Sequence, residues 1–187
     1  GDYCYDEVLV DLLRETLSRP SKEHRVIVLH MIGSHGPTYY RRYPEKFAKF
    51  VPDCPRSDIQ NCEEAELTNT YDNTIAYTDY VLGQIIEQLS TIPNSSMLYL
   101  SDHGESLGEK GLYLHGFPYN LAPVEQTHVP MVYWASKFSQ PEYSDCVKSL
   151  SSHPYSHDNL FDTLLGLTNV QSSTYQPTQD ILRKCES

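Results

Sequence analysis

Positive charge is scarce in this sequence. The 187 residues carry 14 lysines and arginines against 25 aspartates and glutamates, a formal net charge of −11. No basic run is longer than two residues, as in Arg41-Arg42. Because such a surface repels a phosphate backbone, nucleic acid is excluded as a partner. An anionic substrate could still bind if a metal ion supplied the local positive charge.

Long apolar runs are absent as well. No segment approaches the roughly 20 residues that a helix needs to cross a bilayer. No signal peptide precedes the structured-looking C-Y-D-E near the start, and the chain begins at Gly1 without an initiator methionine. We therefore expect a piece of a longer protein, of a length that suits one domain.

Several motifs of known chemistry are also missing. The sequence has no CxxC pair, no glycine-rich phosphate loop, no GxSxG elbow and no H-E-x-x-H. These absences exclude a zinc knuckle, a P-loop, the nucleophile elbow of an α/β-hydrolase and a zincin site. Any catalytic site in this chain must therefore be built from other residues.

Helical and strand patterns alternate along the chain. Apolar residues recur with helical spacing, and short runs rich in β-branched residues lie between them. Residues 38–62 should be mostly irregular. This order predicts an α/β layered domain with a largely parallel sheet. We expect helices over 6–17, 63–90 and 158–167, and buried strands over 25–32, 96–100 and 129–134.

The five cysteines favour disulfide bonds. Cys54 and Cys62 flank the segment C-P-R-S-D-I-Q-N-C, whose length suits a small closed loop. Cys146 and Cys185 could form a second pair, which leaves Cys4 to find a partner in an upstream segment. Disulfides indicate an oxidising compartment. The alternative is that the first pair are free thiols in a cytosolic loop.

Histidine-bearing loops follow two of the predicted strands. S-H-G-P comes after 25–32, and S-D-H-G-E comes after 96–100. Ligands bind at the carboxyl ends of strands in open α/β sheets, so both loops should share one edge. His35 is the candidate in the first loop, with a bond to backbone as its alternative role. His30, within the strand, is expected to be a core histidine.

The second loop combines acids and histidines. Asp102 and His103 are common types of zinc ligand, and Glu105 and His115 follow in a segment that is flexible at four glycines. A simple surface loop would not need that mixture. The alternative is a solvated turn in which Ser101 or Asp102 caps a helix.

Four segments carry a family resemblance: V-I-V-L-H-M-I-G-S-H-G-P, Y-D-N-T-I-A-Y-T-D-Y, Y-L-S-D-H-G-E-S-L-G-E-K-G-L-Y-L-H-G-F-P and Y-S-H-D-N-L-F-D-T-L-L-G-L. Together they resemble the soluble domain of the phosphoethanolamine transferases, which modify lipid A and other bacterial envelope glycans and in some cases confer polymyxin resistance. The resemblance runs from about Cys4 to about Val170. It implies an alkaline-phosphatase-like α/β/α fold, here incomplete at the N-terminus, with residues 1–187 as the C-terminal portion of a single periplasmic catalytic domain.

The resemblance also implies roles for single residues. Asp102 and His103 match ligands of a catalytic zinc in the family. His35 and His115 match histidines that help bind a second zinc or the phosphoethanolamine group. Glu105 matches an acid near the same site. One or two zinc ions are therefore the expected cofactors.

Other family positions concern the cysteines and the nucleophile. The pair that resembles Cys54 and Cys62 is a disulfide in the family, and Cys4 matches a half-cystine whose partner lies just upstream. The family's remaining zinc ligands are a glutamate and a threonine, and that threonine is the nucleophile. Neither position is present in this chain, so the fragment should be inactive alone.

The implied reaction is transfer of phosphoethanolamine from phosphatidylethanolamine to lipid A or another envelope glycan, through a phosphothreonine. It would take place at the periplasmic face of the inner membrane of a Gram-negative bacterium, with the full-length protein anchored through a missing N-terminal region. Two rival hypotheses remain: a sulfatase or phosphodiesterase of the same superfamily, and a non-catalytic periplasmic domain.

Overall fold

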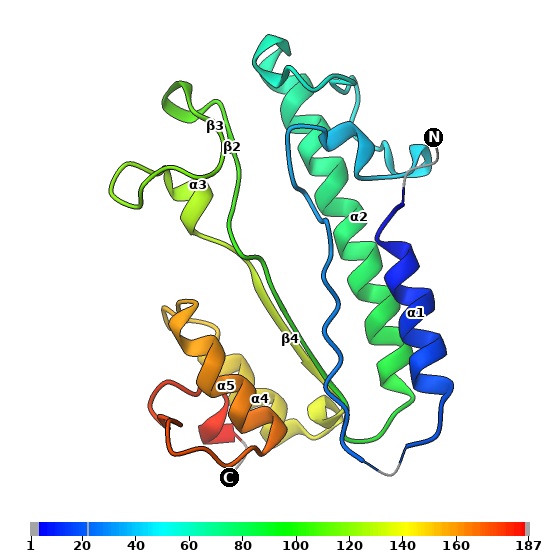
Figure 1. Ribbon diagram of the computed structural model, residues 1–187, viewed down its shortest axis with the longest axis vertical. Coiled ribbons are helices and arrows are strands. Elements are labelled where there is room, and N and C mark those ends of the chain that lie inside the picture. Colours follow the sequence, from blue (N-terminus) through cyan, green and yellow to red (C-terminus); the bar gives the residue numbers. More distant parts are fainter. Residues whose placement is uncertain (1–3, 22, 186–187) are drawn as a thin grey trace.

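The computed structural model describes residues 4–21 and 23–185, so the ends of the expected domain range 1–187 lie outside the described residues. Figure 1 shows the paired strands β1 and β4 between two groups of helices, with α1 and α2 to one side and α4 and α5 to the other. The helices and strands are α1 (Glu7–Ser18), α2 (Glu64–Ser90), β1 (Ser96–Leu100), β2 (Ser106–Leu107), β3 (Tyr113–Leu114), α3 (Val124–Thr127), β4 (Met131–Ala135), α4 (Pro141–Leu150) and α5 (Asp158–Thr168).

The main core lies between α1 and α2. Val10 and Leu13 from α1 meet Tyr77, Val81 and Ile85 from α2, and all five are buried. Their spacing of three or four residues puts each set on one helical face, so each helix buries an apolar stripe against the other. The three predicted long helices are confirmed within one residue at each end.

The segment 25–32 differs from the prediction of a buried strand. It runs as an extended segment along α2 (Figure 1), but it is assigned to no strand and pairs with none in the described part of the chain. Leu29 and Met31 pack on the core, whereas Val26 is 68% and Val28 is 86% exposed. His30 is exposed too, so its expected core position is wrong. A strand needs a hydrogen-bonded neighbour, and no described segment supplies one.

The described strands pair antiparallel, which corrects the expected parallel order. β1 and β4 run from Ser96 opposite Ala135 to Leu100 opposite Met131, and β2 pairs with β3 in the same sense. A parallel pair needs a crossover of a dozen or more residues, usually a helix. The connection from β1 to β4 instead contains a small hairpin and the one-turn helix α3, and it brings the chain back at the same end of the sheet.

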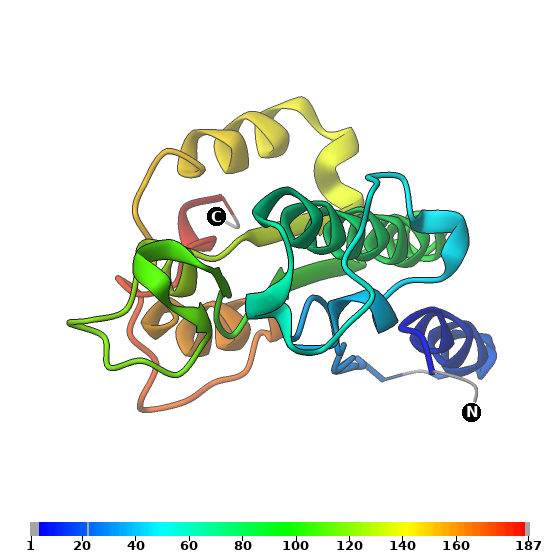
Figure 2. The same ribbon diagram turned by 90° about the horizontal axis from the view of Figure 1, so that it is seen from above.

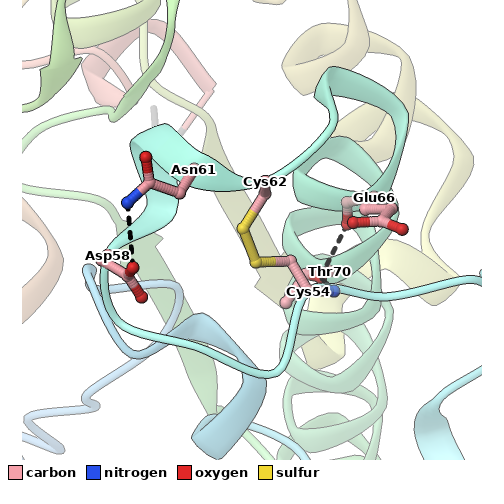
Figure 3. The surroundings of a disulfide bond; sticks show 6 residues. All are labelled: Cys54, Asp58, Asn61, Cys62, Glu66 and Thr70. Carbon is pink, nitrogen blue, oxygen red and sulfur yellow. Dashed lines mark hydrogen bonds between the residues drawn. A yellow bond between two sulfur atoms is a disulfide. The ribbon is translucent and has the colours of Figure 1, made fainter.

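Both predicted disulfides are confirmed. Cys54 bonds to Cys62, and Cys146 bonds to Cys185. Figure 3 shows the first of these beside α2, where the Thr70 hydroxyl accepts from the backbone N–H of Cys54 at 2.6 Å. This disulfide closes the irregular segment that precedes α2. None of the helices in the described ranges combines the length and apolar character that a bilayer crossing requires.

Candidate metal centre

Three histidines from distant parts of the sequence meet at one end of the β1–β4 sheet. One ring nitrogen from each of His35, His103 and His115 lies within 4.8 Å of the other two. The rings of His103 and His115 are stacked with centroids 3.8 Å apart, and the His35 ring lies 5.0 Å from that of His115. The structure thus brings together all three histidines that the sequence singled out for this site.

The same nitrogen of each ring is already bonded to the protein. Nδ1 lies 2.7 Å from the Gly36 carbonyl oxygen in His35, and 3.0 Å from the Gly104 carbonyl oxygen in His103. A carbonyl only accepts, so Nδ1 carries the proton in both rings and a neutral ring keeps its lone pair on Nε2. This is the usual arrangement of metal-binding histidines, whose second nitrogen is held by backbone or carboxylate.

Asp102, the other predicted ligand, lies beside His103 on the surface side of the cluster. Its Oδ2 lies 3.8 Å from Nε2 of His103, and its side chain is 86% exposed. An oxygen and an imidazole nitrogen at this separation could both approach one ion after a small rotation of the exposed carboxylate. The three imidazoles therefore fit a zinc ion by donor type and by convergence, and Asp102 lies outside this converging group.

Glu105 lies beneath the histidines and is only 6% exposed. Its Oε1 accepts from the backbone N–H of Gly36 at 3.0 Å and lies 3.2 Å from Nδ1 of His115, while its Oε2 accepts from the Tyr39 hydroxyl at 3.1 Å. Both oxygens are therefore engaged within the protein. Glu105 holds the loops of His35 and His115 together, a role that the sequence pattern alone did not reveal.

Burial and negative charge keep the neighbouring tyrosines protonated. Burial, with the nearby carboxylate of Glu105, raises the pKa of Tyr39 well above its usual range. Burial, again with a contribution from Glu105, raises the pKa of Tyr71 to about 12. Tyr39 is therefore a hydrogen-bond donor to Glu105 at any physiological pH.

The loop that carries His35 is fixed by the start of α1 and by α2. The carboxylate of Asp6 is 7% exposed and accepts from the backbone N–H groups of Ile32 and Gly33 at 3.0 and 2.9 Å. The hydroxyls of Thr74 and Ser34 lie 2.7 Å apart. Two long-range sets of hydrogen bonds thus position a turn that sequence reasoning described only as a loop.

The loop that carries Asp102 and His103 is held from behind by α3. The backbone N–H of Gly104 donates to the Gln126 carbonyl at 3.0 Å, and the buried Gln126 side chain donates to the hydroxyl of Ser106 at 2.8 Å. Sequence analysis missed Gln126. The only local feature that could have predicted this role is an amide side chain in a short turn, and such residues are common in turns without a functional role.

A second support comes from the start of α5. Nε2 of His157 lies 2.9 Å from the carbonyl oxygen of Ser101, the residue before Asp102. A cleft of about 390 Å³ opens beside this loop, and His30 and His128 also line it.

The chain matches the sulfatase family model over residues 1–170. It is 52% identical to phosphoethanolamine transferase EptA of Salmonella typhimurium over 97% of its own length, which is 34% of that relative. The chain thus spans about a third of the length of this curated relative.

Two solved structures have the same fold. The C-terminal periplasmic domain of phosphoethanolamine transferase EptC from Campylobacter jejuni matches with a TM-score of 0.87 and 47% identity, over 95% of this chain and 57% of that one. The integral membrane protein lipooligosaccharide phosphoethanolamine transferase A from Neisseria meningitidis matches with a TM-score of 0.90 and 45% identity, over 97% of this chain and 35% of that one. The expected alkaline-phosphatase-like fold is confirmed, and the chain belongs to the sulfatase family.

Proposed function

We propose that the protein transfers phosphoethanolamine from phosphatidylethanolamine to lipid A or another envelope glycan, through a phosphothreonine whose threonine lies outside this chain. The observation that carries the proposal is the convergence of three imidazoles whose Nε2 atoms all remain available. The names of the relatives support the group that is transferred. The name of the Neisseria meningitidis relative, a lipooligosaccharide phosphoethanolamine transferase, supports a lipid-linked glycan as acceptor.

Asp102 and His103 would hold a zinc ion, with His35 or His115 completing its coordination or holding a second one. Bound zinc would lower the pKa of the nucleophile and offset negative charge on the phosphoryl oxygens. Imidazoles and carboxylates are typical ligands of catalytic zinc sites, in which three protein ligands leave the fourth position open for substrate. In a chain with a net charge of −11, such local positive charge would favour the binding of a phosphate.

The protein's own residues would position the phosphate and move protons. His35 and His115 would donate from Nε2 to phosphoryl oxygens when protonated, or serve as the acid for the leaving group. Glu105 lies 3.2 Å from Nδ1 of His115 and thereby fixes the orientation of the ring. We therefore assign Glu105 a positioning role, since both of its oxygens are already bonded.

The setting of this reaction is part of the proposal. We infer that residues 1–187 are the C-terminal portion of one catalytic domain on the periplasmic face of the inner membrane. The periplasmic origin of one solved relative and the membrane anchoring of another support this setting. The two disulfides agree with an oxidising compartment.

A sulfatase or phosphodiesterase is the second candidate, because the matched family model is the sulfatase model. The two reactions differ in the nucleophile, so the residues upstream of this chain discriminate between them. A threonine there favours the transferase, whereas a cysteine or serine in C/S-x-P-x-R favours the sulfatase. Stoichiometric zinc in the full-length protein would argue against a non-catalytic domain.

The test is to express the full-length protein in a Gram-negative host and to measure lipid A by mass spectrometry. With the unaltered full-length protein (the parent), lipid A should gain the mass of phosphoethanolamine. Asp102→Ala should abolish that gain. Asp145→Ala is the matched control, because Asp145 is also an exposed aspartate but lies on α4. Full activity of Asp102→Ala would refute the ligand assignment, and an unmodified lipid A with the parent would refute this acceptor.

A further inference from the structure

The segment that leaves the candidate metal centre is apolar and exposed. Residues 116–124, G-F-P-Y-N-L-A-P-V, follow directly after His115 and contain no charged residue. We call them the 116–124 loop. Figures 1 and 2 show this green loop projecting from the body of the molecule beside α3. Its exposed apolar side chains are Phe117 at 38%, Tyr119 at 84%, Leu121 at 63% and Val124 at 61%.

The tip of the loop satisfies part of its own backbone. The N–H groups of Leu121 and Ala122 both donate to the Pro118 carbonyl, at 2.8 and 2.9 Å. Pro118 and Pro123 carry no N–H of their own. A turn of this kind can enter a poorly hydrated environment at a lower cost than an open strand, because fewer backbone groups lose a hydrogen bond.

We propose that the 116–124 loop inserts into the interfacial region of a phospholipid bilayer and thereby places the histidine cluster at the level of the lipid headgroups. This inference rests on the proposed function, in which donor and acceptor are both lipids. Tyrosine and phenylalanine are suited to the boundary between headgroups and acyl chains, and Leu121 and Val124 add aliphatic area beside them.

The charge of the chain decides which kind of bilayer fits. A net charge of −11 gives no attraction to an anionic leaflet, so binding must come from apolar burial. An uncharged loop offers that burial without bringing like charges to the surface. The occupant is therefore a bilayer of zwitterionic lipid, such as phosphatidylethanolamine mixed with phosphatidylcholine.

Tryptophan quenching in the full-length protein tests the insertion directly. Leu121→Trp would be reconstituted in phosphatidylethanolamine–phosphatidylcholine vesicles that contain brominated phosphatidylcholine, with the parent protein as baseline. Leu12→Trp is the matched control, because Leu12 is 51% exposed on α1, away from the loop. We expect added quenching at position 121 and none at position 12. Equal quenching at both positions, or none at 121, would overturn the proposal, as would a lipid-independent blue-shifted emission that shows the loop covered by protein.

Activity with two donors separates this inference from the proposed function. Leu121→Asp should lower transfer from donor in a bilayer roughly tenfold, the equivalent of losing one buried aliphatic side chain, and should leave turnover of a water-soluble short-chain donor unchanged. Equal losses with both donors would overturn the insertion. If the parent turned over neither donor, the proposed function would fail, and the quenching result alone would decide the insertion.

Discussion

Glu105 and His115 lie opposite each other across the β2–β3 hairpin, with Oε1 of the carboxylate 3.2 Å from Nδ1 of the ring. The register explains the contact. Ser106 pairs with Leu114, so the next pair outward joins Glu105 to His115. Ten residues apart in sequence, the two are neighbours because a short antiparallel hairpin returns the chain to the site.

Glu105→Gln should therefore weaken metal binding while leaving the fold intact. The amide oxygen can still accept from Gly36 and His115, but the substitution removes the negative charge beside His115 and turns the group that faces Tyr39 from an acceptor into a donor. Loss of such a supporting contact typically costs about 10–100-fold in metal affinity. Competition with a chromophoric zinc chelator measures the affinity, and far-ultraviolet circular dichroism checks the fold.

Tyr39→Phe is the control for that experiment. It removes the bond to Oε2 but keeps the contact between Glu105 and His115. A smaller loss of zinc affinity than in Glu105→Gln is expected. Zinc affinity equal to that of the parent in Glu105→Gln would show that the carboxylate does not position the ring.

Gly104 cannot accept a side chain unless the loop that carries Asp102 and His103 moves. A Cβ at this position would lie 1.9 Å from the backbone oxygen of Glu125. Gly104→Ala should therefore destabilise the protein by roughly 1–3 kcal/mol and lower its zinc affinity, because α3 and the loop must separate. Denaturant unfolding and metal titration measure the two effects.

Gly83→Ala, a second glycine-to-alanine change, should have the opposite effect on the stability of the protein. Gly83 lies within α2, and nothing approaches the place where its Cβ would be. Alanine favours the helix over glycine by about 0.5–1 kcal/mol, so this variant should gain stability with unchanged zinc affinity. An equally tolerated alanine at 104 would mean that the loop has room that the structure does not show.

His157→Ala should loosen Ser101, the residue that precedes the proposed metal ligands Asp102 and His103. Its ring bonds to the Ser101 carbonyl, and a hydrogen bond of this kind contributes about 1 kcal/mol, so zinc affinity should fall several-fold. The electronic spectrum of the cobalt-substituted protein should also change, because the ligand geometry is less well defined. His153→Ala is the matched control, since the described contacts of that exposed ring involve Tyr155 and not the metal loop. A cobalt spectrum identical to that of the parent would remove His157 from the set of positioning residues.

The sequence predicted the helices and the identity of the site better than it predicted the sheet. Periodicity identified α1, α2 and α5, and in α1 and α2 the apolar stripe lies against the core. In α5 the buried residues are instead Asp162 and Thr163. It misjudged 25–32, whose apolar run indicated burial although described neighbours cover only alternate side chains. Composition cannot show which segment will lie beside a strand.

The candidate site was likewise predicted only in part from the sequence. Loop position predicted that His35 and His103 would share one edge, and the family resemblance added His115; the three rings do meet, although 25–32 pairs with no described strand. Gln126 and His157 were missed as supports, since their contacts join residues 20 and 56 positions apart. Pairing at such a distance depends on the packed fold, and single residues carry no local pattern for it.

Alkaline pH should weaken the folded state through Tyr71. Its pKa is raised from 10.0 to about 12 by burial and by the nearby Glu105, so the unfolded chain releases this proton first. The stabilisation that protonated Tyr71 contributes is complete below pH 10 and is lost as the pH rises towards 12. In that window the folded state binds more protons than the unfolded state. The free energy of unfolding should therefore fall with pH more steeply in the unaltered protein than in Tyr71→Phe.

Denaturant unfolding at pH 9, 10 and 11 measures the slope of the free energy of unfolding against pH. These pH values cover the lower part of that window. Tyr119→Phe, an exposed tyrosine in the 116–124 loop, should keep the slope of the parent. Parallel slopes in the parent and Tyr71→Phe would mean that Tyr71 ionises equally easily in both states.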